Sequence, residues 1–328
     1  MAVSVKEQVL ACLNQQRGSS VSGQELARRL GVTRAAVWKA ITALRQEGWP
    51  IDSATNRGYR LAGEADVLDA AAVSAQLTVP LRVEVLSTTP STNGALRARG
   101  GEPEGLVLVA AAQTEGRGRM GRAFYSPEGT GLYLSVLLHP VLEIHQTPLL
   151  TAAAAVAAAE AAESLCGRPV QIKWVNDLLL DGKKVCGILT EASMDLEGGG
   201  LEYAVLGEGF DVCTPAGGWP PDLQAVAGSL LPDAAPPPGA RAALAAAFLN
   251  RFWPLYKALP ACDFLPDYRA RQAALGRTVE VMRPGAAPRH AVALEVDDNC
   301  RLVVRYLDGS RETAALNSGE LRINLGNL

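Results

Sequence analysis

Along the first fifty residues, apolar side chains recur at helical spacing in three stretches. The first covers residues 5–13 and stops before a Gly-Ser-Ser sequence. The second, 23–30, follows Ser22 as a capping residue, and Gly31 ends it. The third is capped by Thr33 and carries Val, Ile and Leu at one-turn intervals. The pattern predicts three short helices, with a tight turn between the second and the third.

A small hairpin should follow, because residues 51–61 form two β-prone runs around Asn56-Arg57-Gly58, a turn that favours positive φ. Three helices and such a hairpin predict a winged helix-turn-helix at residues 1–62, whose third helix would enter the major groove of DNA. Its outward positions are Arg34, Ala35, Trp38 and Lys39. We expect Arg34 and Lys39 to contact DNA directly, and Arg45 and the wing residue Arg57 to bind phosphate. Small three-helix units also serve as protein-interaction modules, and this alternative stays open.

From residue 64 onward, short apolar runs alternate with helical stretches. The predicted strands are 83–86, 106–110, 132–138, 170–175, 185–190 and 203–206, and the predicted helices are 65–77, 91–99, 148–165 and 241–258. This alternation predicts a mixed-sheet α+β domain at residues 63–275.

The last part of the chain contains strand signals only. They lie at 278–282, 290–296, 301–306 and 312–315, separated by turns rich in Asp, Asn and Gly. Four short strands of this kind suit a small β-barrel of SH3-like size at residues 276–328. The overall fold class is therefore α+β.

Composition narrows the classes of function. The chain has 31 basic and 34 acidic side chains and a formal net charge of −3, so any DNA contact must come from a local basic patch. The six cysteines include no C-x-x-C pair, which disfavours a zinc site or a disulfide framework and indicates a reducing compartment. The N-terminus is not a signal peptide, and the longest apolar run, 148–159, is shorter than the roughly 20 residues of a membrane span. We expect a cytoplasmic protein without membrane contact.

Residues 113–122 read Gln-Thr-Glu-Gly-Arg-Gly-Arg-Met-Gly-Arg. The glycines match a dinucleotide-binding fingerprint, but that fingerprint needs a helix to open in the loop, and Ser126 and Pro127 are poor continuations of a helix. The arginines are more informative, since their guanidinium groups repel one another in an empty loop and suit phosphate or carboxylate oxygens. We expect a loop that is mobile until it closes over an anion. A solvated basic loop or a nucleic-acid patch is the alternative.

A second motif is Lys173-Trp174-Val175-Asn176-Asp177, followed by a turn and a return strand that begins near Lys184. This arrangement predicts that Asp177 and Lys184 lie near one another across a hairpin. A lysine offsets charge on phosphate and acyl oxygens, and a carboxylate accepts a proton or holds a magnesium ion. Spacing alone favours the simpler interpretation, which is an ordinary surface ion pair.

Taken together, these motifs resemble the biotin–protein ligase family, in its class with an N-terminal repressor domain. The resemblance covers nearly the whole chain. It rests on the winged helix, Ser91-Thr92-Asn93, Gln113, Gly116 to Arg122, Lys173 to Asp177, Lys184 to Leu189 and Ser318-Gly319-Glu320-Leu321.

The resemblance implies a role for each matching residue. Biotin would be bound by Ser91, Thr92, Asn93, Gln113, Arg117, Gly118, Arg119, Lys184 and Gly187. ATP and the adenylate would be bound by Arg119, Arg122, Asn176, Lys184 and Trp219. The catalytic set would be Lys184, Asp177, Arg119 and Arg122, with Asp177 as the Mg²⁺ ligand.

The implied reaction has two steps. ATP converts biotin to biotinyl-5′-AMP, and a lysine of a biotin carboxyl carrier protein then takes the biotinyl group. In this family the adenylate also serves as corepressor, so that a homodimer binds two half-sites of operator DNA. The resemblance therefore implies a ligase that also represses transcription.

Three departures from the family pattern open an alternative. Val175 stands where proline is usual, Phe124 stands where tryptophan is usual, and Gly207-Glu208-Gly209-Phe210-Asp211 places carboxylates in a run that is usually apolar. If Glu208 is buried, it needs a partner or a raised pKa. One alternative is a biotin-sensing repressor with impaired catalysis. A lipoate ligase of the related fold is another, which the winged helix and the arginine spacing disfavour.

Overall fold

The computed structural model describes residues 4–16, 18–46, 49–54, 58–61, 66, 68–194, 200–233, 236–259, 261–283, 286–310, 312–317 and 320–323. The chain forms two compact units. The first comprises Met1–Val67 with Pro236–Ala240, and the second comprises Leu68–Ala235 with Arg241–Leu328. The predicted domain boundaries after residues 62 and 275 remain predictions.

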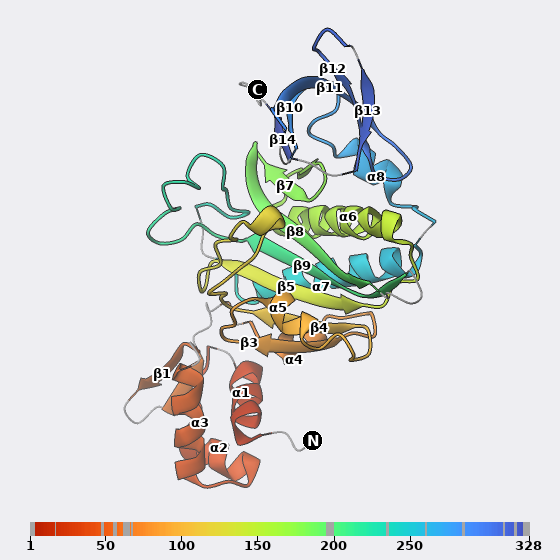
Figure 1. Cartoon of the computed structure of the whole chain (residues 1–328). Coiled ribbons are helices and arrows are strands. Elements are labelled where there is room, and N and C mark those ends of the chain that lie inside the picture. The colour runs from red at the N-terminus through yellow and green to blue at the C-terminus, as the bar shows by residue number, and fades with distance from the viewer. Residues whose placement is uncertain are drawn as a thin grey trace. The chain divides into compact units, whose positions relative to one another are not determined.

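The first unit is a helix-turn-helix followed by a hairpin (Figure 1). Helices α1 (Val5–Gln15), α2 (Gly23–Leu30) and α3 (Arg34–Gln46) precede the antiparallel strands β1 (Ile51–Ala54) and β2 (Gly58–Leu61). The Ser22 hydroxyl accepts from the Glu25 amide at 3.0 Å, and Gly31 ends α2 in the left-handed region with φ of 65°. The apolar stripes meet in a core that contains Val9, Leu13, Leu26, Val37, Ile41 and Leu44. The predicted winged helix-turn-helix is confirmed, while the turn at 55–57 lies outside the described residues.

In the described part of the chain, the second unit is built on a seven-stranded mixed sheet. Its strands are β3 (Arg82–Leu86), β4 (Leu106–Ala110), β5 (Gly131–Leu138), β6 (Gln171–Lys173), β7 (Asp177–Leu180), β8 (Lys183–Met194) and β9 (Leu201–Asp211). They lie in the order β3-β4-β5-β9-β8-β7-β6, where β3 and β4 pair parallel and the other neighbours pair antiparallel. The predicted α+β class is confirmed.

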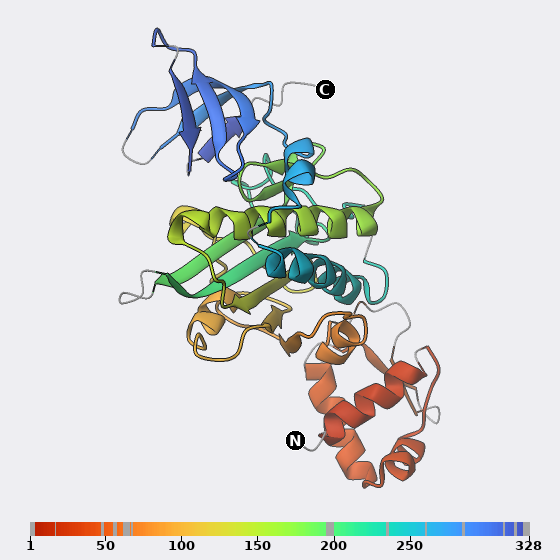
Figure 2. The same ribbon diagram turned by 90° about the vertical axis from the view of Figure 1, so that its right-hand side faces the viewer.

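Helices cover both faces of this sheet (Figure 2). Helices α6 (Thr147–Cys166) and α7 (Ala240–Lys257) lie side by side on one face, and α5 (Thr92–Arg97) packs on the other. The alternation of side chains along β9 separates the two faces. Phe210 contacts Phe248 of α7 with ring centroids 6.2 Å apart, whereas Gly207 faces Asn93 of α5. The face toward α5 carries the candidate site.

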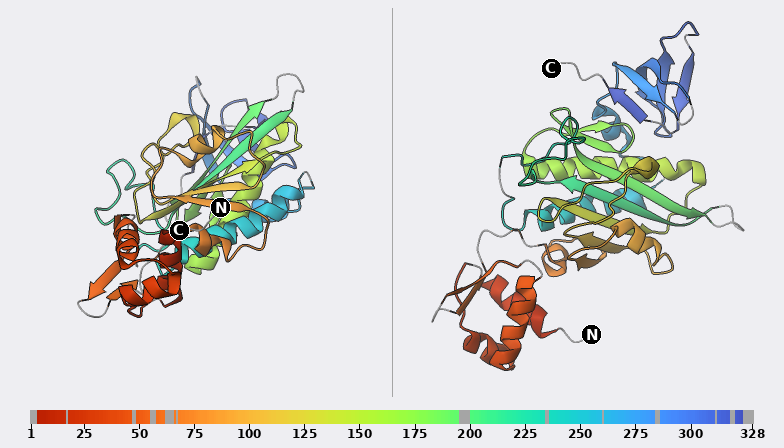
Figure 3. Two further views of the ribbon diagram at one scale, coloured as in Figure 1. Left: turned by 90° about the horizontal axis from the view of Figure 1, so that it is seen from below. Right: turned by 60° about the vertical axis from the view of Figure 1, so that its left-hand side comes forward.

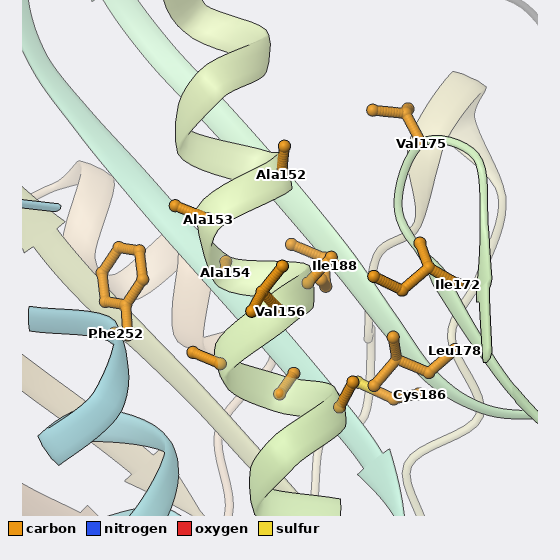
Figure 4. Close-up of a cluster of buried hydrophobic side chains, with 14 of the residues drawn as sticks. Ala152, Ala153, Ala154, Val156, Ile172, Val175, Leu178, Cys186, Ile188 and Phe252 are labelled. Carbon is orange, nitrogen blue, oxygen red and sulfur yellow. The ribbon is translucent and has the colours of Figure 1, made fainter. Parts of the chain in front are cut away.

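Helix α6 is rich in alanine, and its small side chains let it lie close to the sheet (Figure 4). Ala154 and Val156 are buried among side chains of the sheet that include Ile172, Leu178 and Ile188. The segment Ile144–Cys166 has the length and hydropathy of a membrane span, but 67% of its apolar 18-residue stretch is buried inside this unit. Among the described residues it is therefore a core helix.

Several predicted elements have different lengths, and β7 was missed, because a turn was expected between Asp177 and the return strand near Lys184. The strand expected at 170–175 is β6, the strand expected at 185–190 is the longer β8, and the helix expected at 91–99 is α5. Two further differences have a visible local cause. A helix was expected at 65–77, but α4 covers only Ala70–Ser74, because Asp69 caps it by accepting from the Ala72 amide at 2.8 Å. A strand was expected at 203–206, but β9 runs from Leu201 to Asp211. Its glycines weaken the strand signal in the sequence, yet β5 and β8 pair with it on both sides and hold it in the sheet.

The C-terminal part forms a five-stranded antiparallel sheet in the described residues (Figure 3). After helix α8 (Leu265–Ala270) come β10 (Thr278–Met282), β11 (Arg289–Val296), β12 (Leu302–Tyr306), β13 (Thr313–Leu316) and β14 (Glu320–Ile323). They lie in the order β13-β12-β11-β10-β14, and alternate residues such as Val279 and Val281 are buried. The four predicted strands are confirmed, β14 was missed, and the sheet is consistent with a small barrel.

Candidate active site and DNA-binding helix

The start of α5 forms one end of the candidate site. Ser91 caps the helix, since its hydroxyl accepts from the Gly94 amide at 3.4 Å. The Gln113 side-chain oxygen accepts from the Thr92 amide at 2.9 Å and from the Thr92 hydroxyl at 3.2 Å. The Gln113 amide nitrogen donates to the Ser126 hydroxyl at 3.0 Å. These contacts fix which way the Gln113 amide points.

Asn93 lies beside this group and is buried in a polar network. Its side-chain oxygen accepts from the Ser135 hydroxyl at 2.6 Å, and its nitrogen donates to a Glu191 carboxylate oxygen at 2.9 Å and to the Leu189 carbonyl at 3.2 Å. A Cβ added at Gly207 would come within 2.1 Å of the Asn93 oxygen. Glycine at 207 therefore makes room for a side chain that three partners hold rigidly.

Phe124 covers the middle of the site. A Cβ at Gly209 would come within 2.4 Å of its ring, and a Cβ at Gly187 would lie 3.2 Å from the ring and 3.1 Å from Lys184 Nζ. Because Gly187 of β8 and Gly209 of β9 have no side chains, the Phe124 ring and the Lys184 side chain lie directly on the backbone of these strands, which we call the glycine floor. From the sequence, Phe124 was expected only to depart from the family pattern, and its place in the site was missed.

The arginine loop is a tight turn rather than the start of a helix. The Gly118 amide donates to the Arg122 carbonyl at 2.7 Å, and the Arg122 amide donates to the Arg119 carbonyl at 3.2 Å, which closes the turn Arg119–Gly121 (η1). Met120 and Gly121 in this turn have positive φ of 57° and 74°, which is not helical geometry. This geometry agrees with the rejection of a dinucleotide fingerprint. One Arg119 guanidinium nitrogen donates to Asn176 Oδ1 at 2.9 Å. The loop is thereby attached to the hairpin, and its closure over an anion stays a prediction.

The hairpin brings Asp177 and Lys184 together, as predicted. Lys184 Nζ lies 2.7 Å from Asp177 Oδ1, and both side chains are partly buried. Asn176 donates from Nδ2 to Asp177 Oδ1 at 3.2 Å and to the Ile188 carbonyl at 3.0 Å. A register shift between Leu178 and Leu179 allows this meeting, because it places Lys184 opposite Leu179. Leu179 and Asp177 are alternate residues of β7 and share one face, so Lys184 lies on the same face as Asp177. Asn176 therefore connects the arginine loop to the ion pair.

Two cavities meet at these residues. The first, of about 50 Å³, is lined by Ser91, Thr92, Asn93, Gln113, Arg117, Gly118, Arg119, Phe124, Leu134, Asn176, Lys184, Gly187, Ile188, Leu189, Gly207, Glu208 and Gly209. The second, of about 790 Å³, includes Gly118, Arg119, Met120, Arg122, Phe124, Asn176, Asp177 and Lys184 in its lining. The residues common to both are Gly118, Arg119, Phe124, Asn176 and Lys184. We call these five residues the shared wall.

The structure therefore gathers most of the predicted site residues. All those assigned to biotin line the first cavity, and Arg119, Arg122, Asn176, Asp177 and Lys184 line the second. Trp219 lines neither of these two cavities, and instead packs edge to face on Tyr125 with ring centroids 6.3 Å apart.

Sequence reasoning missed several residues of the second cavity. Strands β10, β11 and β14 contribute residues that include Glu280, His290 and Arg322, and the segment after β9 contributes Leu223 and Val226. They lie far along the chain from the motifs, so spacing gives no signal for them. Only the terminal motif around Leu321, which also lines the cavity, pointed to this region.

Glu208 and Asp211 are buried, as their place in a strand suggested. Glu208 Oε2 accepts from the Cys186 thiol at 3.7 Å, and Oε1 has no hydrogen-bond partner among the described residues. Desolvation raises the pKa of both carboxyl groups well above the usual range, and nearby Lys184 only partly opposes this for Asp211. Since Gly207 and Gly209 face the site, alternation turns the Glu208 side chain toward the helices α6 and α7.

In the first unit, the predicted DNA-contacting residues have different environments. Arg34, Trp38 and Lys39 are exposed on α3, in agreement with their predicted outward positions. Arg45 donates from Nε to the Ile51 carbonyl at 2.8 Å and so ties α3 to β1. Arg57 lies outside the described residues. No role in DNA binding is tested by this geometry.

Comparison with known proteins gives the following similarities. Residues 5–60 match a helix-turn-helix domain family, and residues 85–211 match the biotin/lipoate A/B protein ligase family. The bifunctional ligase/repressor BirA of Bacillus subtilis (strain 168) is 36% identical over 236 residues, which cover 70% of this chain and 72% of that protein. The biotin–[acetyl-CoA-carboxylase] ligase of Mycobacterium tuberculosis is 32% identical over 251 residues, which cover 73% and 88%. The structure of a biotin protein ligase from Aquifex aeolicus in complex with biotin and ATP has a TM-score of 0.60 at 25% identity, covering 74% of this chain and 97% of that chain.

Proposed function

The chain belongs to the biotin/lipoate A/B protein ligase family, in its bifunctional ligase/repressor class, and we propose that it joins biotin to AMP at the shared wall. It is a biotin–protein ligase with a DNA-binding repressor unit. Biotin and ATP are its substrates, and a lysine of a biotin carboxyl carrier protein is the acceptor. Its place of action is the cytoplasm.

Each substrate takes one cavity. Biotin occupies the first, with its ring near Ser91, Thr92 and Asn93 and in hydrogen-bond reach of Gln113, while Arg117, Gly118 and Gly187 close around it. ATP occupies the second cavity, where Arg122 and Asn176 contact its phosphates. This assignment is supported because every residue predicted to bind biotin lines the first cavity, and every residue predicted to bind ATP except Trp219 lines the second. Trp219 packs on the adenine only if its loop moves, because it now contacts Tyr125.

The observation that carries the proposal is that Arg119 and Lys184 line both cavities. In the first step a biotin carboxylate oxygen attacks the α-phosphorus of ATP, and the bond to pyrophosphate breaks. Both reactants are anions, so bringing them together requires fixed positive charge where they meet. Two cations on the shared wall supply it, and the glycine floor lets the reactants approach the backbone closely.

In the second step the amine of the acceptor lysine attacks the acyl carbon of the mixed anhydride, and AMP leaves. Asp177 accepts the proton that the ammonium must lose. It is now held by Lys184 at 2.7 Å, so Lys184 exchanges this partner for substrate oxygens when they bind. Asp177 also fits Mg²⁺, because that ion is typically held by one or two carboxylates together with substrate phosphates. Bound there, the ion would neutralise phosphate charge.

The repressor activity uses the adenylate as corepressor. We propose that a chain holding biotinyl-5′-AMP forms a homodimer, and that the dimer places two α3 helices on two operator half-sites. Arg34 and Lys39 contact the DNA, while Arg57 and Arg45 hold phosphates.

A ligation assay tests the enzyme. The full chain is incubated with ATP, Mg²⁺, radiolabelled biotin and a carrier domain, and pyrophosphate release is followed separately. We expect labelled carrier, and we expect Lys184→Ala to slow adenylate formation about 10²- to 10³-fold. Lys257→Ala is the matched control, because Lys257 pairs with Glu104 away from both cavities.

The same assay separates the alternatives. A chain that binds biotin but labels no carrier would indicate a sensor with impaired catalysis, for which buried Glu208 and Asp211 are the candidate cause. Labelling by lipoate and not by biotin would indicate a lipoate ligase. A wild-type rate in Lys184→Ala would contradict the role of the shared wall.

A further inference from the structure

Trp38 is a large apolar side chain left in water on the surface of α3. It is 59% exposed, whereas Trp49 in the same unit is 8% exposed. Burial of a side chain of this kind stabilises a folded protein by about 2–3 kcal/mol, and the folded unit does not obtain this stabilisation at position 38. A single exposed apolar side chain is ordinary on a protein surface. Trp38 is singled out because it lies on the second helix of a helix-turn-helix, whose outward residues face the major groove when such a unit binds DNA.

The surroundings of Trp38 indicate the charge of that partner. Helix α3 begins at Arg34, after Thr33, whose hydroxyl accepts from the Ala36 amide at 3.1 Å. Arg34 lies one turn before Trp38, and Lys39 follows it, both exposed. Helix α3 contains no acidic residue. The face around the indole ring is therefore cationic and suits a polyanion.

The shape of this face also suits a groove. Ala35 lies three residues before Trp38 and is exposed, so no long side chain stands between the ring and a partner on that side. On the next turn, the Thr42 hydroxyl donates to the Trp38 carbonyl at 2.9 Å and so turns back onto its own helix. Two of the helix neighbours of the ring, Ala35 and Thr42, are therefore small, and Arg34 is the long exposed side chain beside it.

We propose that Trp38 reads thymine in the major groove of duplex DNA, through apolar contact between the indole ring and the C5-methyl group. This rests on the proposed repressor function and identifies a determinant of its sequence preference. The thymine methyl is the apolar group that base edges present in the major groove, where it distinguishes T·A from the other pairs. The charges of Arg34 and Lys39 add affinity that does not depend on the thymine methyl group, and Trp38 adds the preference for thymine.

Removing the methyl group without changing any hydrogen bond tests the inference. The full-length chain, with biotin, ATP and Mg²⁺ present, is first used to select preferred sequences from random duplexes. Each thymine of the selected site is then replaced by deoxyuridine, and Kd is measured by fluorescence anisotropy at one fixed salt concentration. The proteins are the wild type, Trp38→Ala and Lys39→Ala.

For the wild type we expect at least one thymine whose replacement weakens binding about fourfold, the effect of one buried methyl group. Trp38→Ala should bind the thymine and uracil duplexes equally. Lys39→Ala should bind both more weakly but keep the fourfold ratio, because a charge contact does not sense the methyl group. Since Trp38 is exposed, its replacement should leave the circular dichroism and melting temperature of the chain unchanged.

Three results would overturn the inference. The first is a wild-type protein that binds every uracil duplex as tightly as its thymine parent. The second is a thymine-to-uracil ratio that survives in Trp38→Ala. The third is unchanged DNA binding with weakened self-association in Trp38→Ala, which would place the ring in a protein interface. A wild-type chain that selects no sequence would instead refute the repressor proposal, and this inference with it.

Discussion

Replacing Glu208 by glutamine should make the free energy of unfolding less sensitive to pH. The carboxyl group is 3% exposed, and one of its oxygens has no hydrogen-bond partner among the described residues. Burial raises the pKa of Glu208 well above its ordinary value of about 4.5, because the ionised form loses its hydration. At pH values between the unfolded pKa and the raised folded pKa, the folded chain therefore holds a proton that the unfolded chain has released.

The sign and the size follow from this difference. A carboxyl group whose pKa is raised by folding stabilises the folded chain fully at pH values below its pKa in the unfolded chain, about 4.5. This stabilisation is lost as the pH rises toward the pKa of the group in the folded chain. For one proton the slope is about 1.4 kcal/mol per pH unit. Glutamine keeps the size and polarity but does not ionise. Between pH 5.5 and 7.5, Glu208→Gln should gain up to about 3 kcal/mol relative to the wild type.

Urea denaturation at pH 5.5, 6.5 and 7.5 measures this difference. Asp211, whose pKa burial also raises, is present in both proteins, so its contribution cancels. Glu128→Gln is the control, because Glu128 is an exposed glutamate. A difference between Glu208→Gln and the wild type that stays constant with pH would refute the reasoning, as would an equal slope in the control.

Three further predictions concern the site and the two units. Gly207→Ala should displace Asn93 and weaken biotin binding about 5- to 150-fold in calorimetry, since overpacking costs about 1–3 kcal/mol. Gly101→Ala is the control and should bind normally, because no atom lies within 4 Å of the added Cβ; equal affinities in the two variants would contradict the role of Gly207. Arg119→Gly should speed escape of the adenylate by removing the bond to Asn176, and an unchanged dissociation rate would count against it. Deleting residues 1–62 should abolish operator binding and spare part of the ligation rate; complete loss of ligation would show tighter coupling.

Local patterns were sufficient for much of the fold. Capping residues and helical spacing located α2 and α3, and the helix predicted at 91–99 contains α5. The length of β9 was missed because its glycines carry no strand signal of their own, and neighbours far along the chain hold the strand in the sheet. The length of α4 was overestimated because the alanine-rich run contains no signal stronger than the Asp69 cap.

The candidate site divides in the same way. The Asp177–Lys184 pair was predictable because a hairpin brings near neighbours together. Ser135 was missed because it comes from β5 and meets Asn93 only through the packing of α5 on the sheet. The direction of the Glu208 side chain also depends on register, since a shift of one residue would turn it toward the site.

The shared wall makes the two cavities thermodynamically dependent on each other. Arg119 and Lys184 line both cavities, so an anion in either cavity interacts with the same two positively charged side chains. Occupation of one cavity must then change the dissociation constant in the other, and linkage requires that the factor be the same in both directions. The order in which two substrates arrive can therefore alter the rates of binding, but it cannot alter the free energy of the complete ternary complex.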